Sequence, residues 1–149
     1  MHKDEYFMEI AISEACKSLE YNDVPVGAIV VMGDEVISAA HNEREKKSNA
    51  IYHAEMLAIS RACEKLNNWR LNDASIYVTL EPCPMCAGAI VQSRIKRLIF
   101  GACDLKMGAC GSITDITRDY RYNHWVTVDG PLLEDKCSEL LKAFFSELR

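Results

Sequence analysis

Hydrophobic and polar positions follow a helical period in three parts of this chain. Apolar side chains recur at three- and four-residue spacing in residues 5–21, 53–66 and 134–148. A fourth helix is expected over residues 84–93, where small side chains would allow another helix to approach closely. The pattern therefore predicts four helices.

Shorter apolar runs lie between these helices and are typical of buried strands. Residues 26–32 form a continuous apolar run, and after a Gly33-Asp34 turn the chain returns as a second strand over 35–40. Three more strands are expected, at 76–80, 97–101 and 126–128. Because strands and helices alternate after the first hairpin, we expect a mixed sheet between two helical layers, a three-layer α/β/α sandwich.

Two stretches follow neither period. Residues 41–52 are polar and are predicted to form a loop, whereas residues 102–124 are too long for a simple connection and are predicted to be functional. No internal repeat or linker divides the sequence, so we expect residues 1–149 to form a single domain.

Composition narrows the class of protein. The chain is 49% hydrophobic and 26% charged, which is typical of a globular protein. No apolar run approaches the roughly 20 residues of a membrane span, and the polar N-terminus does not resemble a secretory signal. Seven irregularly spaced cysteines indicate a reducing compartment, with free thiols at Cys16, Cys63, Cys103, Cys110 and Cys137. We therefore expect a cytoplasmic protein without a membrane partner.

The net charge of −5 is unevenly distributed. Residues 1–35 hold eight acidic and two basic side chains, whereas residues 94–121 hold six basic and three acidic ones. Residues 41–50 add three further basic side chains. A local basic face for nucleic acid therefore remains possible, and a solvated surface without a partner is the alternative.

Two motifs carry the donor atoms of a metal site. Cys83 and Cys86 fall where a strand gives way to a helix, with Pro84 suited to the first helical position. A helix N-terminus lowers the pKa of a thiol, and thiolate is the form that binds metal. With His53 as a third ligand and Glu55 as a nearby carboxylate, the pattern indicates one catalytic zinc per chain, whose fourth position is left to water.

Alternatives exist for both motifs. The zinc could be structural, with Cys63, Cys103 or Cys110 as a fourth ligand. Glu55 could serve only to interact with a helix dipole. Residues two apart do not face each other along a helix, so His53 and Glu55 converge only if the helix end points at the metal.

Taken together, the two motifs resemble the signature of a known family. His53-Ala54-Glu55 and Pro82-Cys83-Pro84-Met85-Cys86 form the H-x-E…P-C-x-x-C signature of the zinc nucleobase deaminases. Over nearly the whole chain the sequence is similar to bacterial tRNA-specific adenosine deaminases, within the cytidine/deoxycytidylate deaminase superfamily. Stretches that carry this similarity include Val24-Pro25-Val26-Gly27-Ala28, Trp69-Arg70-Leu71, Ser93-Arg94-Ile95 and Phe100-Gly101-Ala102.

The resemblance implies a cytidine deaminase-like fold with a five-stranded sheet, a homodimer, and deamination of adenosine to inosine at the wobble position of a tRNA anticodon. It assigns His53, Cys83 and Cys86 as zinc ligands and Glu55 as the proton carrier. It also assigns Asn42 to reading the base, and it places Asp104 on a loop against the RNA.

The sequence departs from the family pattern at residues 49–52 and at Cys103 and Met107. Two alternatives remain open, namely a small-molecule cytidine, cytosine or guanine deaminase and a non-catalytic zinc-stabilised RNA-binding module.

Overall fold

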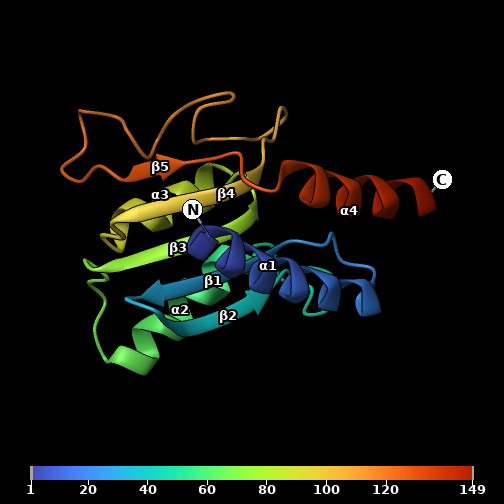
Figure 1. Cartoon of the computed structure of the whole chain (residues 1–149), viewed down its shortest axis with the longest axis horizontal. Helices are drawn as coiled ribbons and strands as arrows, with labels where there is room; N and C mark the ends of the chain where they lie inside the picture. The colour runs from blue at the N-terminus through green and yellow to red at the C-terminus, as the bar shows by residue number, and fades with distance from the viewer. Residues whose placement is uncertain (1, 149) are drawn as a thin grey trace.

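The computed structural model describes residues 2–148, and its centre is one five-stranded sheet (Figure 1). The strands are β1 (Gly27–Met32), β2 (Glu35–His41), β3 (Ala74–Leu80), β4 (Arg97–Ala102) and β5 (Thr127–Asp129). Their order is β2-β1-β3-β4-β5. Strand β1 is antiparallel to both β2 and β3, whereas β3, β4 and β5 run parallel. The prediction of a five-stranded mixed sheet is confirmed.

Helices cover both faces of this sheet. They are α1 (His2–Cys16), the short 3-10 helix η1 (Lys17–Tyr21), α2 (Ala54–Leu66), α3 (Pro84–Gln92) and α4 (Glu134–Glu147). Helices α1 and α4 lie on the face towards the viewer in Figure 1, and α2 and α3 lie behind the sheet. The three-layer α/β/α sandwich is therefore confirmed. The helix predicted over residues 5–21 begins earlier and ends at Cys16, because the chain tightens into η1 before turning at Asn22.

Alternate residues of the central strands build two separate cores. Ile29 and Val31 pack with Tyr77 and Ile99 under α1, whereas the intervening side chains pack against α2 and α3. Burial on both faces explains why β1 reads as a continuous apolar run instead of an alternating pattern.

Helix α1 lies very close to the sheet at the first residue of β1. A Cβ atom at Gly27 would collide with backbone atoms of Ala11 and Ala15. Glycine is therefore required here by a close backbone approach.

A group of polar side chains connects α1 to β3, β4 and β5. The Tyr77 hydroxyl donates to Asp4 at 2.6 Å, and the two terminal nitrogens of Arg97 donate to the same carboxylate at 2.9 and 2.7 Å. The Nε of Arg97 donates to Asp129 of β5 at 2.8 Å. These bonds hold the pKa of Asp4 at about 2, chiefly through the hydrogen bonds from Arg97.

The sheet topology determines where the site lies. Strands β3 and β4 run parallel with Leu80 opposite Ala102, so both end at the same edge of the sheet. Helix α3 begins just after β3, and the loop that carries Asp104 begins just after β4. In parallel sheets this edge is where ligands bind.

None of the seven cysteines forms a disulfide, and the five that were predicted to be free thiols are free. In residues 2–148, every helix is too short or too polar to cross a bilayer.

Candidate active site

His53, Cys83 and Cys86 come together at the edge where β3 ends. The Nδ1 atom of His53 lies 3.6 Å from the Sγ of Cys83 and 3.5 Å from the Sγ of Cys86, and the three donor atoms all lie within 4.8 Å of one another. Tetrahedral zinc with ordinary Zn–N and Zn–S bonds separates nitrogen from sulfur by about 3.6 Å. The three residues therefore fit one face of a tetrahedral zinc site.

Two helix starts produce this arrangement. His53 is the residue that precedes α2, with extended backbone (φ −72°, ψ 153°), and Cys83 has the same position before α3 (φ −75°, ψ 174°). Pro84 occupies the start of α3, as predicted. Both side chains thus extend from the ends of neighbouring helices, towards a common point.

The thiols are electrostatically coupled. Hydrogen bonds with Cys86 and His53 lower the pKa of Cys83 to about 4, and the bond with Cys83 raises the pKa of His53. The pKa of Cys86 is raised, because its proton is shared with the Cys83 thiolate and its sulfur is buried. A bound cation would displace that proton, since coordinating thiols are deprotonated.

Glu55 lies in the first turn of α2, is only 4% exposed, and lines the same cavity as His53 and Cys83. Because His53 precedes the helix, the spacing of two residues does not direct the two side chains apart. Burial raises the pKa of Glu55 to about 7, and a dication held at the neighbouring triangle would lower it.

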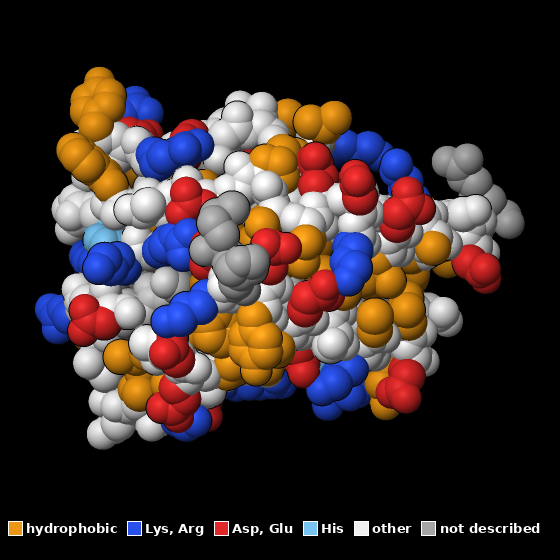
Figure 2. Space-filling model, viewed as in Figure 1, with side chains coloured by type: hydrophobic (Ala, Val, Ile, Leu, Met, Phe, Trp, Pro, Cys, Tyr) orange, Lys and Arg blue, Asp and Glu red, His pale blue; other side chains and the backbone are white. Residues whose placement is uncertain are grey.

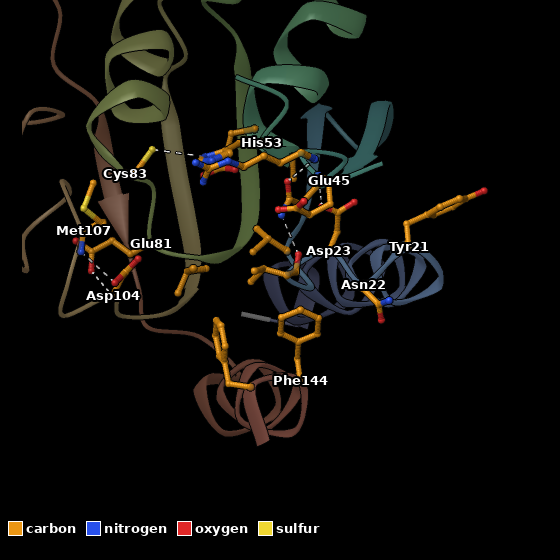
Figure 3. A pocket seen from close by; sticks show the side chains of 18 of the residues that line it. Tyr21, Asn22, Asp23, Glu45, His53, Glu81, Cys83, Asp104, Met107 and Phe144 are labelled. Atoms are coloured by element: carbon orange, nitrogen blue, oxygen red, sulfur yellow. Dashed lines mark hydrogen bonds between the residues drawn. The ribbon is translucent and has the colours of Figure 1, made fainter. Parts of the chain in front are cut away.

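These residues line a cavity of about 600 Å³. Figure 3 shows it bounded by His53 and Cys83, by the loop of Asp104 and Met107, and by Phe144 of α4. The sequence did not indicate that α4 supplies a wall of this cavity, since its apolar stripe predicts only packing against a core.

Asn42 lines the cavity and is 7% exposed. Its Nδ2 donates to the carbonyl of Val24 at 3.1 Å, and its Oδ1 accepts from the N–H of Arg44 at 3.1 Å. The two bonds fix the amide plane. An amide has two N–H groups and two acceptor positions, so one of each is left without a partner among residues 2–148.

Asp104 also lines the cavity, and its carboxylate accepts from the backbone N–H groups of Lys106 and Met107 at 3.0 and 3.1 Å. This carboxylate therefore shapes the turn that follows β4. Both Asn42 and Asp104 thus have conformational roles in their loops in addition to lining the cavity.

Glu81, which no sequence pattern singled out, organises the loop after β4. Its carboxylate accepts from the N–H groups of Asp104, Cys110 and Ser112 and from the Ser112 hydroxyl. Burial alone would raise the pKa of Glu81, but these four bonds outweigh it and the pKa is lowered. The available signal was an acidic residue directly after a buried strand. A Cβ at Gly108 would approach this carboxylate, so the glycine is needed there.

Half of the basic side chains in residues 94–121 are already paired. Arg97 binds Asp4 and Asp129, and two further ion pairs join Arg118 to Asp115 and Arg121 to Asp119. Arg94 donates to carbonyls at the C-terminal end of α3, the end opposite Cys83 and Cys86, and lies over the Trp69 ring. The basic face expected from this stretch is therefore much smaller than its composition indicates.

A mixed sheet between helices, with a His–Cys–Cys triangle and a buried glutamate where two parallel strands end, defines a deaminase of the cytidine deaminase-like fold. Comparison with known proteins agrees with this assignment. The chain belongs to the MafB19-like deaminase family, whose model matches residues 1–149.

Two relatives are especially similar to this chain. The tRNA-specific adenosine deaminase of Bacillus subtilis (strain 168) is 49% identical over 149 residues, which cover 100% of this chain and 92% of the relative. A structure from a study of A-to-I editing by tRNA:A34 deaminases at the wobble position of transfer RNA is 40% identical, with a TM-score of 0.87. That match covers 91% of this chain and 99% of the other.

The fold is shared with a deaminase that is named for a small-molecule substrate. A guanine deaminase from Nitrosomonas europaea superposes with a TM-score of 0.76 over 93% of this chain and 82% of its own, at 24% identity. The shared fold therefore does not distinguish substrates, whereas sequence identity favours the tRNA-specific enzymes.

Proposed function

We propose that this protein is a zinc-dependent enzyme that deaminates adenosine to inosine at the wobble position of a tRNA anticodon, and that it acts in the cytoplasm. The observation that best supports a catalytic role is the position of Glu55, a buried carboxylate lining the cavity beside three metal-ligand side chains. The choice of substrate is supported by the identity to tRNA-specific adenosine deaminases over the whole chain.

His53, Cys83 and Cys86 would hold one zinc ion per chain. Among residues 2–148, this group of possible ligands has three members, which is typical of catalytic and not structural zinc sites. Zinc, when bound, lowers the pKa of water to about 7 and so supplies a nucleophile at neutral pH.

Glu55 carries the protons of the reaction. As the oxygen of water forms a bond to C6 of adenine, Glu55 accepts the released proton and transfers it to N1. Glu55 then accepts the remaining hydroxyl proton and delivers it to the amino group, which leaves as ammonia when the C6–N bond breaks. One adenosine and one water thus give one inosine and one ammonia. Burial holds the carboxylate in place for these transfers.

Asn42 would contact the purine edge, because a fixed amide can both donate to and accept from a base. Asp104 would position the loop that lies against the RNA. An adenosine in a hairpin loop is already unpaired, so its entry into a cavity costs little.

The protein would act as a homodimer. Gly88 lies on α3, and a Cβ added there meets nothing within 4 Å, so packing within the chain does not require a glycine. Large apolar side chains are exposed on the loops next to β5, including Tyr120 (78%) and Trp125 (61%), and Figure 2 shows hydrophobic side chains protruding at that end of the molecule. A second chain would cover such surfaces.

The test compares three substrates, namely an anticodon stem-loop with adenosine at the wobble position, free adenosine and free cytidine. We expect inosine to form in the stem-loop far faster than from free adenosine, with no uridine from cytidine. Uridine formation without inosine in the RNA would instead identify a small-molecule deaminase. RNA binding without any product would identify a non-catalytic binding module.

A further inference from the structure

The unpaired positive charge nearest the cavity lies on the loop between β2 and α2. Arg44, Lys46 and Lys47 are exposed there, and none forms an ion pair with another residue of the described chain. The adjacent Glu43 is buried and already engaged by Arg61. This loop, residues 43–48, thus keeps a positive charge beside the cavity even when the exposed Glu45 is counted, whereas half of the basic side chains in residues 94–121 are already paired.

An aromatic ring lies beside these charges. Tyr21 ends η1, lines the cavity and is 46% exposed, and the Nζ of Lys46 lies 4.5 Å from the centroid of its ring. In Figure 3, Tyr21 extends from the side of the cavity opposite Cys83 and Asp104. An exposed aromatic ring with a neighbouring cation is the combination with which proteins bind unpaired nucleotides.

A buried carboxylate fixes the ring and the loop relative to each other. Asp23 is 1% exposed, and its two oxygens accept from the backbone N–H groups of Glu45 and Lys46. Asn22, with φ of 55°, makes the sharp turn that joins Tyr21 to Asp23. The ring and the cation are thus held in position before any ligand arrives, which reduces the entropy lost on binding.

We propose that Tyr21, Arg44 and Lys46 form a subsite for the nucleotide next to the reacting adenosine. Tyr21 stacks on the base of that nucleotide, and Arg44 and Lys46 bind the phosphates on either side. Arg44 and Tyr21 line the same cavity as His53, so the subsite is continuous with the site of reaction. This inference rests on the proposed function, because it assumes that RNA is the substrate.

The test uses Tyr21→Ala, with Tyr21→Phe to retain the ring. Tyr6→Ala is the matched control, since Tyr6 is 63% exposed on α1 and does not line the cavity. Each variant is assayed on the anticodon stem-loop for inosine formation and, in parallel, for RNA binding by fluorescence anisotropy. Stem-loops with an abasic site on the 5′ or the 3′ side of the adenosine form the second half of the design.

On the intact RNA, Tyr21→Ala should raise KM about tenfold and leave kcat within about twofold, because stacking positions the strand without joining the chemistry. Tyr21→Phe and Tyr6→Ala should behave as the wild type. On one of the two abasic RNAs the penalty of Tyr21→Ala should disappear, which also identifies the side on which the nucleotide binds. Lys46→Ala should weaken binding and reduce its salt dependence more than Lys65→Ala, which removes the same charge at the far end of α2.

The outcomes separate this inference from the proposed function. Suppose that the wild type forms inosine, but that Tyr21→Ala has an unchanged KM on the intact RNA or the same rise in KM on both abasic RNAs. The subsite is then wrong and the function stands. If the wild type binds the stem-loop without forming inosine, while Tyr21→Ala weakens that binding, the subsite stands and the function is wrong. If the wild type does neither, both are wrong.

Discussion

His53 and Cys83 occupy equivalent positions, each as the residue before a helix, with Nδ1 of one 3.6 Å from Sγ of the other. Two separate stretches of sequence thereby deliver their donor atoms to one point without any loop of special conformation. The helices themselves determine the geometry of the candidate metal site.

The first prediction concerns the metal. The wild type should bind one zinc per chain, and Cys83→Ser should weaken zinc affinity by more than about tenfold, since even the loss of an outer hydrogen-bond partner of a ligand costs that much. Cys63→Ser is the control, because Cys63 lies on α2 outside the triangle. Competition with a chromophoric chelator measures the affinity. An unchanged affinity in Cys83→Ser would disprove the ligand set.

The second prediction concerns Glu55. Glu55→Gln preserves size and should leave zinc content and thermal stability near those of the wild type, because the side chain stays buried and can still form hydrogen bonds. Turnover should fall by about 10²–10⁴-fold, since proton transfer by the side chain is lost. Single-turnover measurement of inosine in the stem-loop provides the rate. Activity close to the wild-type level would exclude Glu55 as the proton carrier.

The third prediction concerns stability in acid. The pKa of Asp4 is about 2 in the folded protein, below its ordinary value of 3.8, so this ion pair contributes fully above about pH 4 and its contribution is lost as the pH falls towards 2. Asp4→Asn should therefore lower the free energy of unfolding by about 2 kcal/mol at pH 7. The difference from the wild type should shrink steadily below pH 4, as followed by urea denaturation.

The control for this prediction is Asp34→Asn. Asp34 pairs with Lys3 at the surface, where both side chains are more than 70% exposed, and exposed pairs contribute little to stability. An equal loss in both variants would contradict the role given to the Asp4–Arg97 pair.

The fourth prediction concerns assembly. Gly88→Leu should leave the fold of the chain intact, because the new side chain meets open space, yet it should prevent a second chain from packing against α3. Light scattering should give twice 16.8 kDa for the wild type and 16.8 kDa for the variant. Ser60→Leu, which adds the same side chain at an exposed position of α2, should remain dimeric. A measured mass of one chain for the wild type would disprove the proposed dimer.

The sequence predicted what depends on local pattern and motif. The order of helices and strands followed from apolar periodicity, and His53, Cys83 and Cys86 were found because their residue types are unusual at that spacing. The ion pair between Asp4 and Arg97 could not be predicted, because the two residues are distant in sequence and neither stands out by its type or spacing. For the same reason, the charge of the 94–121 stretch overstated its free positive surface.

The position of Phe144 in the cavity wall could not be predicted either, because an apolar stripe on a helix does not show which surface the stripe faces. Tyr21 and Lys46 meet only because Asp23 connects two loops, and no pattern in either loop indicates this.

The four hydrogen bonds to Glu81 also bear on how new specificities could be built on this scaffold. The segment from Asp104 to Ser112 attaches to the rest of the protein at this carboxylate by three backbone N–H groups and one hydroxyl. Backbone donors are present whatever the side chains, so exposed positions such as Leu105 and Met107 are open to exchange while the attachment is kept. A loop transplanted from a related enzyme should therefore seat correctly if it retains Gly108 and a hydroxyl at position 112. Substrate preference could then be altered through these exposed loop side chains while His53, Cys83 and Cys86 stay unchanged.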